Sequence, residues 1–140
     1  MAADIHPFLS RLVDATNARD LDALVDCFAT GYRNETPAHP SRGFQGNDQV
    51  RSNWEQIFTF VPDVHAVVLN HAVNGEEIWS EWEMTGTRLD HTEHWMRGVI
   101  VFHLADGRAA SARFYLEPVD ETASSIDATI QHQTHAGTTT

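Results

Sequence analysis

The chain has 140 residues, which favours one domain with one hydrophobic core. Its formal net charge of −11 repels phosphate backbones, so we expect no nucleic-acid partner. The N-terminal residues show neither a basic start nor a long apolar run, and no apolar stretch is long enough to span a membrane. Cys27 is the only cysteine and cannot form an intrachain disulfide. We therefore expect a cytoplasmic protein with no membrane segment.

Three helices are predicted in the N-terminal half of the chain. Apolar residues recur three and four positions apart over residues 5–13 and again over 21–28, where Asp20 is a suitable N-cap. Asn47 caps the third helix, whose apolar face ends before Pro62. Each helix thus has one apolar face to bury.

After Pro62 the apolar period changes to two, which is typical of strands. Asn74-Gly75 and Asp106-Gly107 are strong hairpin-turn signals. The predicted strands are a short one over 32–35 and four long ones over 64–73, 76–88, 93–104 and 108–119. Helices followed by a meander define an α+β fold, in which a curved antiparallel sheet is covered by three helices on its concave face. We expect a funnel-shaped pocket between the two layers.

The composition changes at about residue 120. The segment 120–140 is rich in Thr, Ser and Ala and poor in large apolar residues, so it can bury little surface. We therefore predict a domain over residues 1–119 and a polar tail over 120–140.

Three local segments resemble the SnoaL-like domains of the nuclear-transport-factor-like superfamily. They are NARDLDALVDCFA, FQGNDQVRSNWEQI and the last hairpin FHLADGRAASARFY. The order of the predicted elements is also similar, and the resemblance covers about residues 5–119. It implies a cone-shaped barrel with a central pocket. It does not imply one activity, because the superfamily holds isomerases, polyketide cyclases, dehydratases, hydrolases and non-catalytic binders.

The first predicted strand also looks similar to that of limonene-epoxide hydrolases, which carry Tyr-x-Asn there. Tyr32 and Asn34 in YRNETP match those two positions. The Arg-x-Asp pair of these hydrolases follows an Asn-Gly turn, and the matching positions hold Glu81 and Glu83. Their third carboxylate corresponds to about Phe114. The chain thus departs from the hydrolase pattern at its Asp-Arg-Asp core.

The resemblance places the strand face that carries Trp79, Glu81 and Glu83 inside the funnel. These residues alternate with Trp82 and therefore share one face. Burial and mutual repulsion would then favour a protonated carboxyl group, which suits acid–base chemistry. We expect Glu83 as the base and Glu81 as its partner. Alternation alone leaves the opposite arrangement open, with Ile78 and Trp82 inward and the carboxylates in solvent.

Other candidate site residues follow from the same alternation. Tyr32 and Asn34 could position a water molecule or polarise a carbonyl group. His94 could shuttle a proton, although a structural histidine is the simpler interpretation. The expected ligand-binding wall comprises Trp54, Phe58, Trp79, Met96 and Phe114. The histidines show no metal-ligand spacing and the chain has no Gly-rich phosphate loop, so we expect neither a metal nor a cofactor.

Three functions compete at this point. The first is an isomerase, cyclase or hydrolase that uses acid–base chemistry on a small apolar substrate. The second is a non-catalytic protein that binds a hydrophobic ligand in the same funnel, and the third is a purely structural dimer domain. For all three we expect a homodimer formed through the convex sheet face, where Val99, Val101 and Tyr115 would otherwise be exposed.

Overall fold

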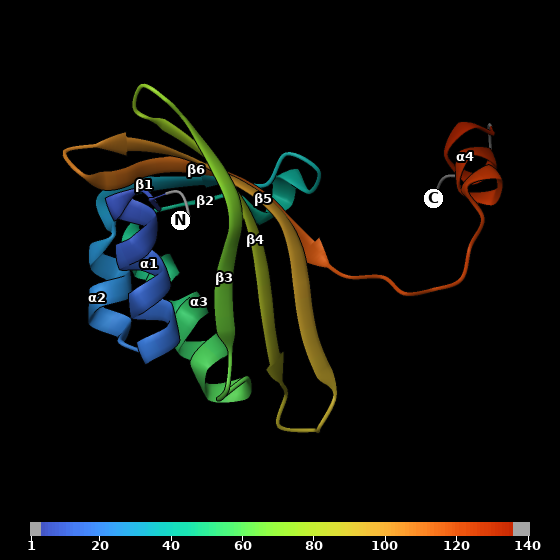
Figure 1. Cartoon of the computed structure of the whole chain (residues 1–140), viewed down its shortest axis with the longest axis horizontal. Helices are drawn as coiled ribbons and strands as arrows, with labels where there is room; N and C mark the ends of the chain where they lie inside the picture. The colour runs from blue at the N-terminus through green and yellow to red at the C-terminus, as the bar shows by residue number, and fades with distance from the viewer. Residues whose placement is uncertain (1–3, 136–140) are drawn as a thin grey trace.

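The computed structural model describes residues 4–135, so the outermost parts of the two predicted units, 1–3 and 136–140, lie outside the described residues. Helices, strands and one short 3-10 helix follow one another in the order shown in Figure 1. They are α1 (Pro7–Ala18), α2 (Leu21–Asp26), β1 (Phe28–Glu35), a 3-10 helix (Pro40–Arg42), β2 (Phe44–Gln45), α3 (Asn47–Phe60), β3 (His65–Asn74), β4 (Glu77–Thr87), β5 (Glu93–Ala105), β6 (Arg108–Pro118) and α4 (Ile126–Thr134).

The six strands form one curved, open sheet in the order β2-β1-β6-β5-β4-β3. Strand β1 pairs in parallel with β6, and all other neighbours are antiparallel. The predicted α+β class and the four-strand meander are confirmed. Two details differ: β1 begins at Phe28, and residues 44–45, which we expected in a loop, form β2.

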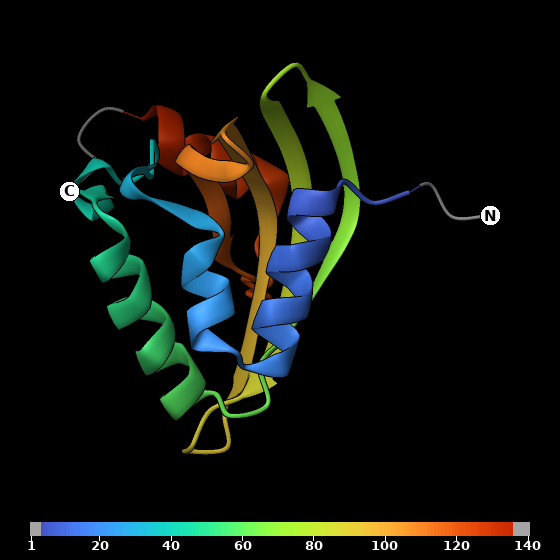
Figure 2. The same cartoon turned by 90° about the vertical axis from the view of Figure 1, so that its left-hand side faces the viewer.

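Helices α1, α2 and α3 lie together on the concave side of the sheet (Figure 2). The end of α1 is fixed to the start of β3 by Asn17, whose amide accepts from the Ala66 N–H at 2.7 Å and donates to the Ala66 carbonyl at 3.0 Å. Arg19, in the left-handed conformation at the helix C-cap, donates to the carbonyls of Pro62 and Val64. The first helix therefore cannot slide along the sheet without breaking these bonds.

The core lies between these helices and the concave face, and α1 contributes more buried side chains to it than α2 or α3. The largest fully buried side chains include Trp82, Tyr32, Phe8, Phe102, Leu9, Leu24, Ile78 and Ile100. Phe8 of α1 packs edge-on against Phe102 of β5, with ring centroids 4.9 Å apart. This apolar burial is the main source of folding free energy.

Helix α3 is held less closely. Only Val50 of this helix is buried; Trp54, Ile57 and Phe58 are half-buried, and Phe60 is exposed. The pocket described below lies between this half-buried helix face and the sheet.

Gly98 in the middle of β5 allows two strands to approach closely. It adopts φ +150°, and a Cβ atom there would overlap the carbonyl oxygen of Tyr115 on β6. Glycine in a strand interior commonly marks such an approach of two backbones.

Beyond β6 the chain leaves the sheet, and α4 lies clear of the other elements (Figure 1). The composition of this segment did not predict a helix, but Ser125 caps it by accepting from the Ala128 N–H. None of the α4 residues is buried. Among the described residues, no helix has the length and apolar character needed to cross a membrane.

Candidate functional site

A pocket of about 270 Å³ opens between α3 and the two strands β1 and β6. Its lining residues are Phe28, Tyr32, Asn34, Thr36, Arg42, Phe44, Val50, Asn53, Trp54, Ile57, Phe114, Leu116 and Glu117. A smaller void of about 20 Å³ lies deeper, towards Trp82 and Met84, and shares Phe28, Trp54 and Phe114 with the pocket. The two together form the funnel between the layers, with a mostly apolar wall.

A larger groove, of about 510 Å³, lies elsewhere, between α2 and the β5–β6 turn. Two surface ion pairs stand in its wall, Asp22 with Arg51 at 2.8 Å and Asp26 with Arg108 at 2.9 Å. These pairs tie α2 to its neighbours, and their charges already satisfy one another. The smaller pocket is the better candidate site because it combines apolar walls with a few convergent polar groups.

Tyr32 and Asn34 lie together in the wall of the pocket. Tyr32 is buried, and its hydroxyl donates to Asn34 Oδ1 at 2.7 Å. Its ring packs edge-on against Phe28, with centroids 4.8 Å apart. Burial raises the pKa of Tyr32, so the hydroxyl stays protonated and remains a donor. The alternation along β1 explains why both side chains reach the same side of the sheet.

The amide nitrogen of Asn34 is available to a ligand. With Oδ1 directed at Tyr32, its Nδ2 has no protein partner among the described residues. Within the described residues, every fully buried side-chain nitrogen or oxygen has a hydrogen-bond partner, so an unpaired Nδ2 is not fully buried. The Nδ2 group therefore keeps access to the pocket that Asn34 lines. An amide donor surrounded by apolar residues can orient a ligand oxygen.

The predicted positions of Glu81, Glu83 and Trp79 inside the funnel are wrong. Strand β4 directs Ile78, Ser80, Trp82 and Met84 inward, and Trp82 is 1% exposed. Glu81 and Trp79 are exposed on the convex face, Trp79 by 45%. The indole of Trp82 donates to the Ser80 hydroxyl at 2.8 Å, which donates in turn to the Ile100 carbonyl at 2.7 Å. This orientation of the strand is the more favourable one, because it buries the large indole, whereas the opposite orientation would remove two carboxylates from water.

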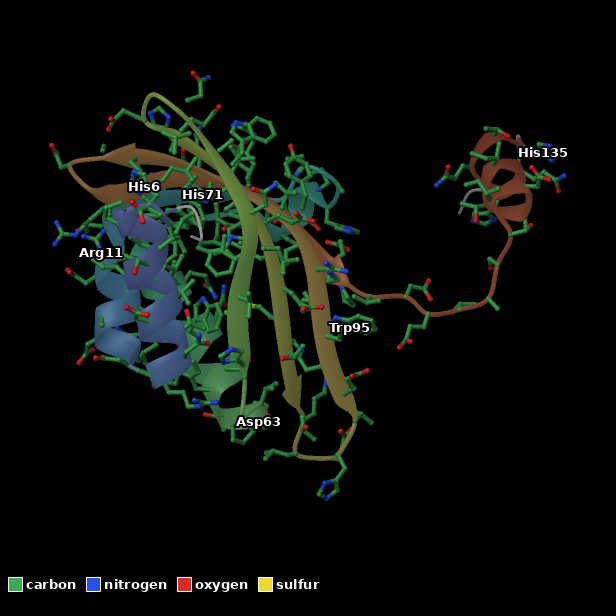
Figure 3. The ribbon with its side chains drawn as sticks, in the orientation of Figure 1. His6, Arg11, Asp63, His71, Trp95 and His135 are labelled. Carbon is green, nitrogen blue, oxygen red and sulfur yellow. The ribbon has the colours of Figure 1, made fainter. Side chains whose placement is uncertain are left out.

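Glu83 is engaged on the convex face instead. Its carboxylate accepts from Trp95 Nε1 at 2.8 Å and lies 3.6 Å from Arg97 Nε. Figure 3 shows Trp95 on the side of β5 that faces away from the helices. Trp79 has a matching arrangement with Glu77, to which its indole donates at 2.9 Å, and with Arg113, which lies over its ring. Glu77 and Glu83 thus each hold a tryptophan side chain on the convex face of the sheet.

One residue expected to be exposed on the convex face is buried. Val101, which we predicted for the dimer surface, is 1% exposed. Trp79 and Arg113 are its register partners on the two neighbouring strands, and the guanidinium of Arg113 lies over the Trp79 ring. These two long side chains cover the smaller valine between them.

His94 lies on the concave side near the turn that joins β4 and β5, opposite Gly86 in the register of these two strands. It is half-buried, and burial, followed by the charge of Arg88, lowers the pKa of His94. Among the residues that line the pocket, His94 is absent, so the described part of the chain does not bring it to Tyr32 and Asn34. Its proposed proton shuttle has no partner in this site.

The expected pocket wall is only partly assembled. Trp54 and Phe114 line both the pocket and the deeper void. Phe58 stacks beside Trp54, with ring centroids 5.6 Å apart, and packs on the core together with Met96. Neither Phe58 nor Met96 is among the lining residues of the pocket.

Sequence reasoning missed the polar end of the pocket, which Thr36, Arg42 and Glu117 form. Simple alternation along β6 would put Glu117 on the convex face with Tyr115. The sequence contains one indication of this polar end: Thr36-Pro37 stops the first strand, and β6 therefore has no β1 partner beyond Arg113. Within residues 4–135, no three His, Cys, Asp or Glu side chains come together as a metal site.

Comparisons with known proteins agree with this architecture. A family model for the SnoaL-like domain matches residues 9–112. No curated protein matches the chain significantly. Solved structures do match: a protein of Catenulispora acidiphila with a ketosteroid isomerase-like fold, in complex with trimethylamine, has a TM-score of 0.69 at 14% identity, over 80% of this chain and 87% of that one.

Two further structural neighbours are proposed polyketide cyclases. The protein of Jannaschia sp. CCS1 has a TM-score of 0.66 at 22% identity, over 83% of this chain and 92% of that one. The protein of Sinorhizobium meliloti has a TM-score of 0.63 at 21% identity, over 81% and 96% respectively. At these identities the neighbours show a shared fold alone.

Proposed function

Because the chain belongs to the SnoaL-like family, we propose that its pocket binds a small, mostly apolar molecule that carries a hydrogen-bond-accepting oxygen. The observation that carries this proposal is the free Nδ2 group of Asn34, whose amide is held by the Tyr32 hydroxyl beside the apolar part of the pocket wall. Trp54, Phe114 and Leu116 would contact the carbon skeleton of the ligand. The Asn34 Nδ2 group would donate to its oxygen.

The neighbours support this class of ligand. Two of them are proposed polyketide cyclases, and polyketides are carbon-rich molecules with regularly placed carbonyl oxygens. Another holds trimethylamine, which has no oxygen but whose three methyl groups correspond to the small apolar part of the proposed ligand. A pocket of about 270 Å³ lies just below the usual range of about 300–1,000 Å³ for ligand sites, which favours a ligand of one or two rings.

The test uses two probes of nearly equal shape. 2-Acetonaphthone carries a ketone, and 2-isopropylnaphthalene lacks it; equilibrium dialysis measures the dissociation constant of each. One neutral hydrogen bond contributes about 1 kcal/mol, so we expect a preference of roughly fivefold for the ketone. Asn34→Leu should abolish that preference and leave the hydrocarbon bound.

A matched pair of variants locates the bound probe. Leu116→Trp fills the pocket, whereas Tyr115→Trp changes the adjacent residue, which is exposed on the convex face. Binding should be lost in the first variant and kept in the second. Equal binding to both variants would place the ligand elsewhere and contradict the proposal.

A further inference from the structure

The hydrogen-bonding groups that the pocket offers to a ligand are mostly donors. Besides the Asn34 amide, two lining residues have an N–H group without a hydrogen-bond partner among the described residues. They are Asn53, whose Oδ1 accepts from Gln49 at 2.8 Å and whose Nδ2 stays free, and Trp54, through its indole Nε1. These N–H groups donate and cannot accept, whereas the hydroxyl of Thr36 can do either. A bound molecule therefore meets this wall best with acceptor atoms.

Arg42 adds a positive charge to these donors. Its Nη1 lies 3.6 Å from Glu117 Oε2, which is close enough for an ion pair but too far for a hydrogen bond. The guanidinium forms no hydrogen bond with any other residue in the described part of the chain. Its five N–H donors lie in a planar fork that matches both oxygens of a carboxylate. This fork therefore remains available to a ligand in the pocket that Arg42 lines.

Glu117 is the one anion in the described lining, and it already has two partners. Its Oε1 accepts from His39 Nε2 at 3.0 Å, in addition to the ion pair with Arg42. A cationic ligand at Glu117 would stand beside the guanidinium and be repelled by it. A carboxylate at Arg42 would leave Glu117 its contact with His39. Two donor side chains around one carboxylate thus leave donors to spare, and this surplus favours an anionic ligand.

The fold places this surplus at the mouth of the pocket. Strand β1 ends before β6 does, and the loop 36–43 brings Arg42 beside the end of β6. The Arg42 side chain is 58% exposed, whereas Trp54 and Phe114 continue from the pocket into the deeper void. A charged group at Arg42 would stay partly hydrated while its carbon skeleton is buried, which avoids the cost of burying an ion.

Resting on the proposed ligand binding, we propose that the natural ligand of this pocket is an organic monocarboxylate, with an apolar skeleton of one or two rings and a carboxylate that pairs with the Arg42 guanidinium. Arg42 then sets the preference for a charged ligand. Glu117 limits that preference, because its own charge repels the ligand carboxylate. Binding involves no covalent step.

Three probes of nearly equal shape test the sign of the ligand charge. At neutral pH 2-naphthoate is an anion, 2-naphthamide is neutral and 2-naphthylmethylammonium is a cation; equilibrium dialysis with the full-length protein measures each dissociation constant. A hydrogen bond between charged partners is about twice as strong as a neutral one, and the exposure of Arg42 weakens it. We therefore expect naphthoate to bind roughly fivefold more tightly than naphthamide, and the cation more weakly than both. Salt at about 0.5 M should reduce the preference, because it screens exposed charges.

Substitutions at the two charged residues should move this preference in opposite directions. Arg42→Gln removes the cation, so the ratio of naphthoate to naphthamide affinity should fall to about one or below. Glu117→Gln removes the neighbouring negative charge, so the same ratio should rise. Arg51→Gln is the matched control, because this arginine pairs with Asp22 outside the pocket, and it should leave the ratio unchanged. Loss of structure alone would not produce opposite changes at two contacting residues.

Each outcome decides between this inference and the proposed function on which it rests. Circular dichroism verifies that every variant is folded, and binding of 2-acetonaphthone is measured on the same preparations. A preference for naphthoate that is lost in Arg42→Gln and enlarged in Glu117→Gln supports the monocarboxylate. Equal binding of naphthoate and naphthamide, tighter binding of the cation, or a preference that persists in Arg42→Gln overturns it, while ketone binding leaves the proposed function intact. Absence of binding by all probes, the ketone included, overturns both.

Discussion

Tyr32→Phe removes a single oxygen atom from the pocket wall, and its effect on stability can be worked out from the contacts. The Tyr32 hydroxyl donates to Asn34 Oδ1 at 2.7 Å, and Asn34 is 9% exposed. The lost hydrogen bond is worth about 1 kcal/mol, and an unsatisfied buried acceptor costs about 1–3 kcal/mol. We therefore expect the free energy of unfolding to fall by about 1–3 kcal/mol.

Urea denaturation followed by tryptophan fluorescence measures this change. Tyr115→Phe is the control, because that hydroxyl lies on an exposed side chain and its loss should change stability by less than about 0.5 kcal/mol. In Tyr32→Phe/Asn34→Leu both polar partners are replaced, so the loss should be smaller than the sum of the two single losses. Additive losses would mean that the two side chains do not interact, which would refute the argument.

The pH dependence gives a second readout of the same group. Burial raises the pKa of Tyr32 above its ordinary value of 10.0, so above that pH the unfolded chain releases a proton that the folded chain retains. The free energy of unfolding then falls by up to about 1.4 kcal/mol per pH unit, and this contribution is fully present below pH 10. Tyr32→Phe lacks the group, so its deficit relative to the unaltered protein should shrink above pH 10. A deficit that stays constant through that range would contradict a buried, protonated phenol.

Three further predictions concern other parts of the fold. Gly98→Ala should lower the free energy of unfolding by at least about 3 kcal/mol or prevent folding, because a Cβ would overlap the Tyr115 carbonyl at a backbone angle that suits glycine. A denaturation midpoint equal to that of the unaltered protein would disprove this. Because burial lowers the pKa of His94, the free energy of unfolding should decline as the pH falls below 6.5, and His94→Asn should lessen that decline. Parallel acid unfolding curves for the variant and the unaltered protein would contradict this. Light scattering should give twice the chain mass, and Trp79→Lys should give a monomer, because exposed apolar side chains on the sheet would be covered in a dimer; they are Val67, Leu69, Trp79 and Tyr115. A monomer mass for the unaltered protein at micromolar concentration would contradict the dimer proposal.

The fold could be predicted from sequence because its signals are local. The Asn74-Gly75 turn fixed the β3–β4 hairpin, and the change of period after Pro62 separated helices from strands. The Tyr32 and Asn34 side chains could be placed on one face by alternation within a single strand. The start of β1 could not, since Phe28 also fits the apolar face of the preceding helix.

The convex position of Glu81 and Glu83 shows the limit of a resemblance. A shift of one residue in alignment moves every side chain of a strand to the other face. Alternation along β4 separates Ile78, Trp82 and Met84 from Glu81 and Glu83, but it does not say which of the two faces is concave. The resemblance to the hydrolases predicts the wrong face for these carboxylates because it fixes the strand only by the spacing from the Asn74-Gly75 turn.

The contact of Glu117 with His39 depends on where β1 ends relative to β6. These two residues are separated by 78 positions, and no local pattern relates them. Alternation by itself assigns Glu117 to the convex face. Beyond Arg113, however, β6 has no β1 neighbour, and Glu117 contacts the loop after β1 and lines the pocket. Such a site emerges from tertiary structure alone.

The looser hold on α3 has a consequence for how proteins of this shape can diversify. Trp54 and Ile57 face the pocket from a helix that has only one buried residue, whereas the opposite wall is a hydrogen-bonded sheet. Substitutions on α3 can therefore change the size and shape of the accepted molecule with little loss of folding free energy. Residues such as Trp82 in the sheet have no such freedom. New ligand preferences should accordingly arise first by mutation of this helix.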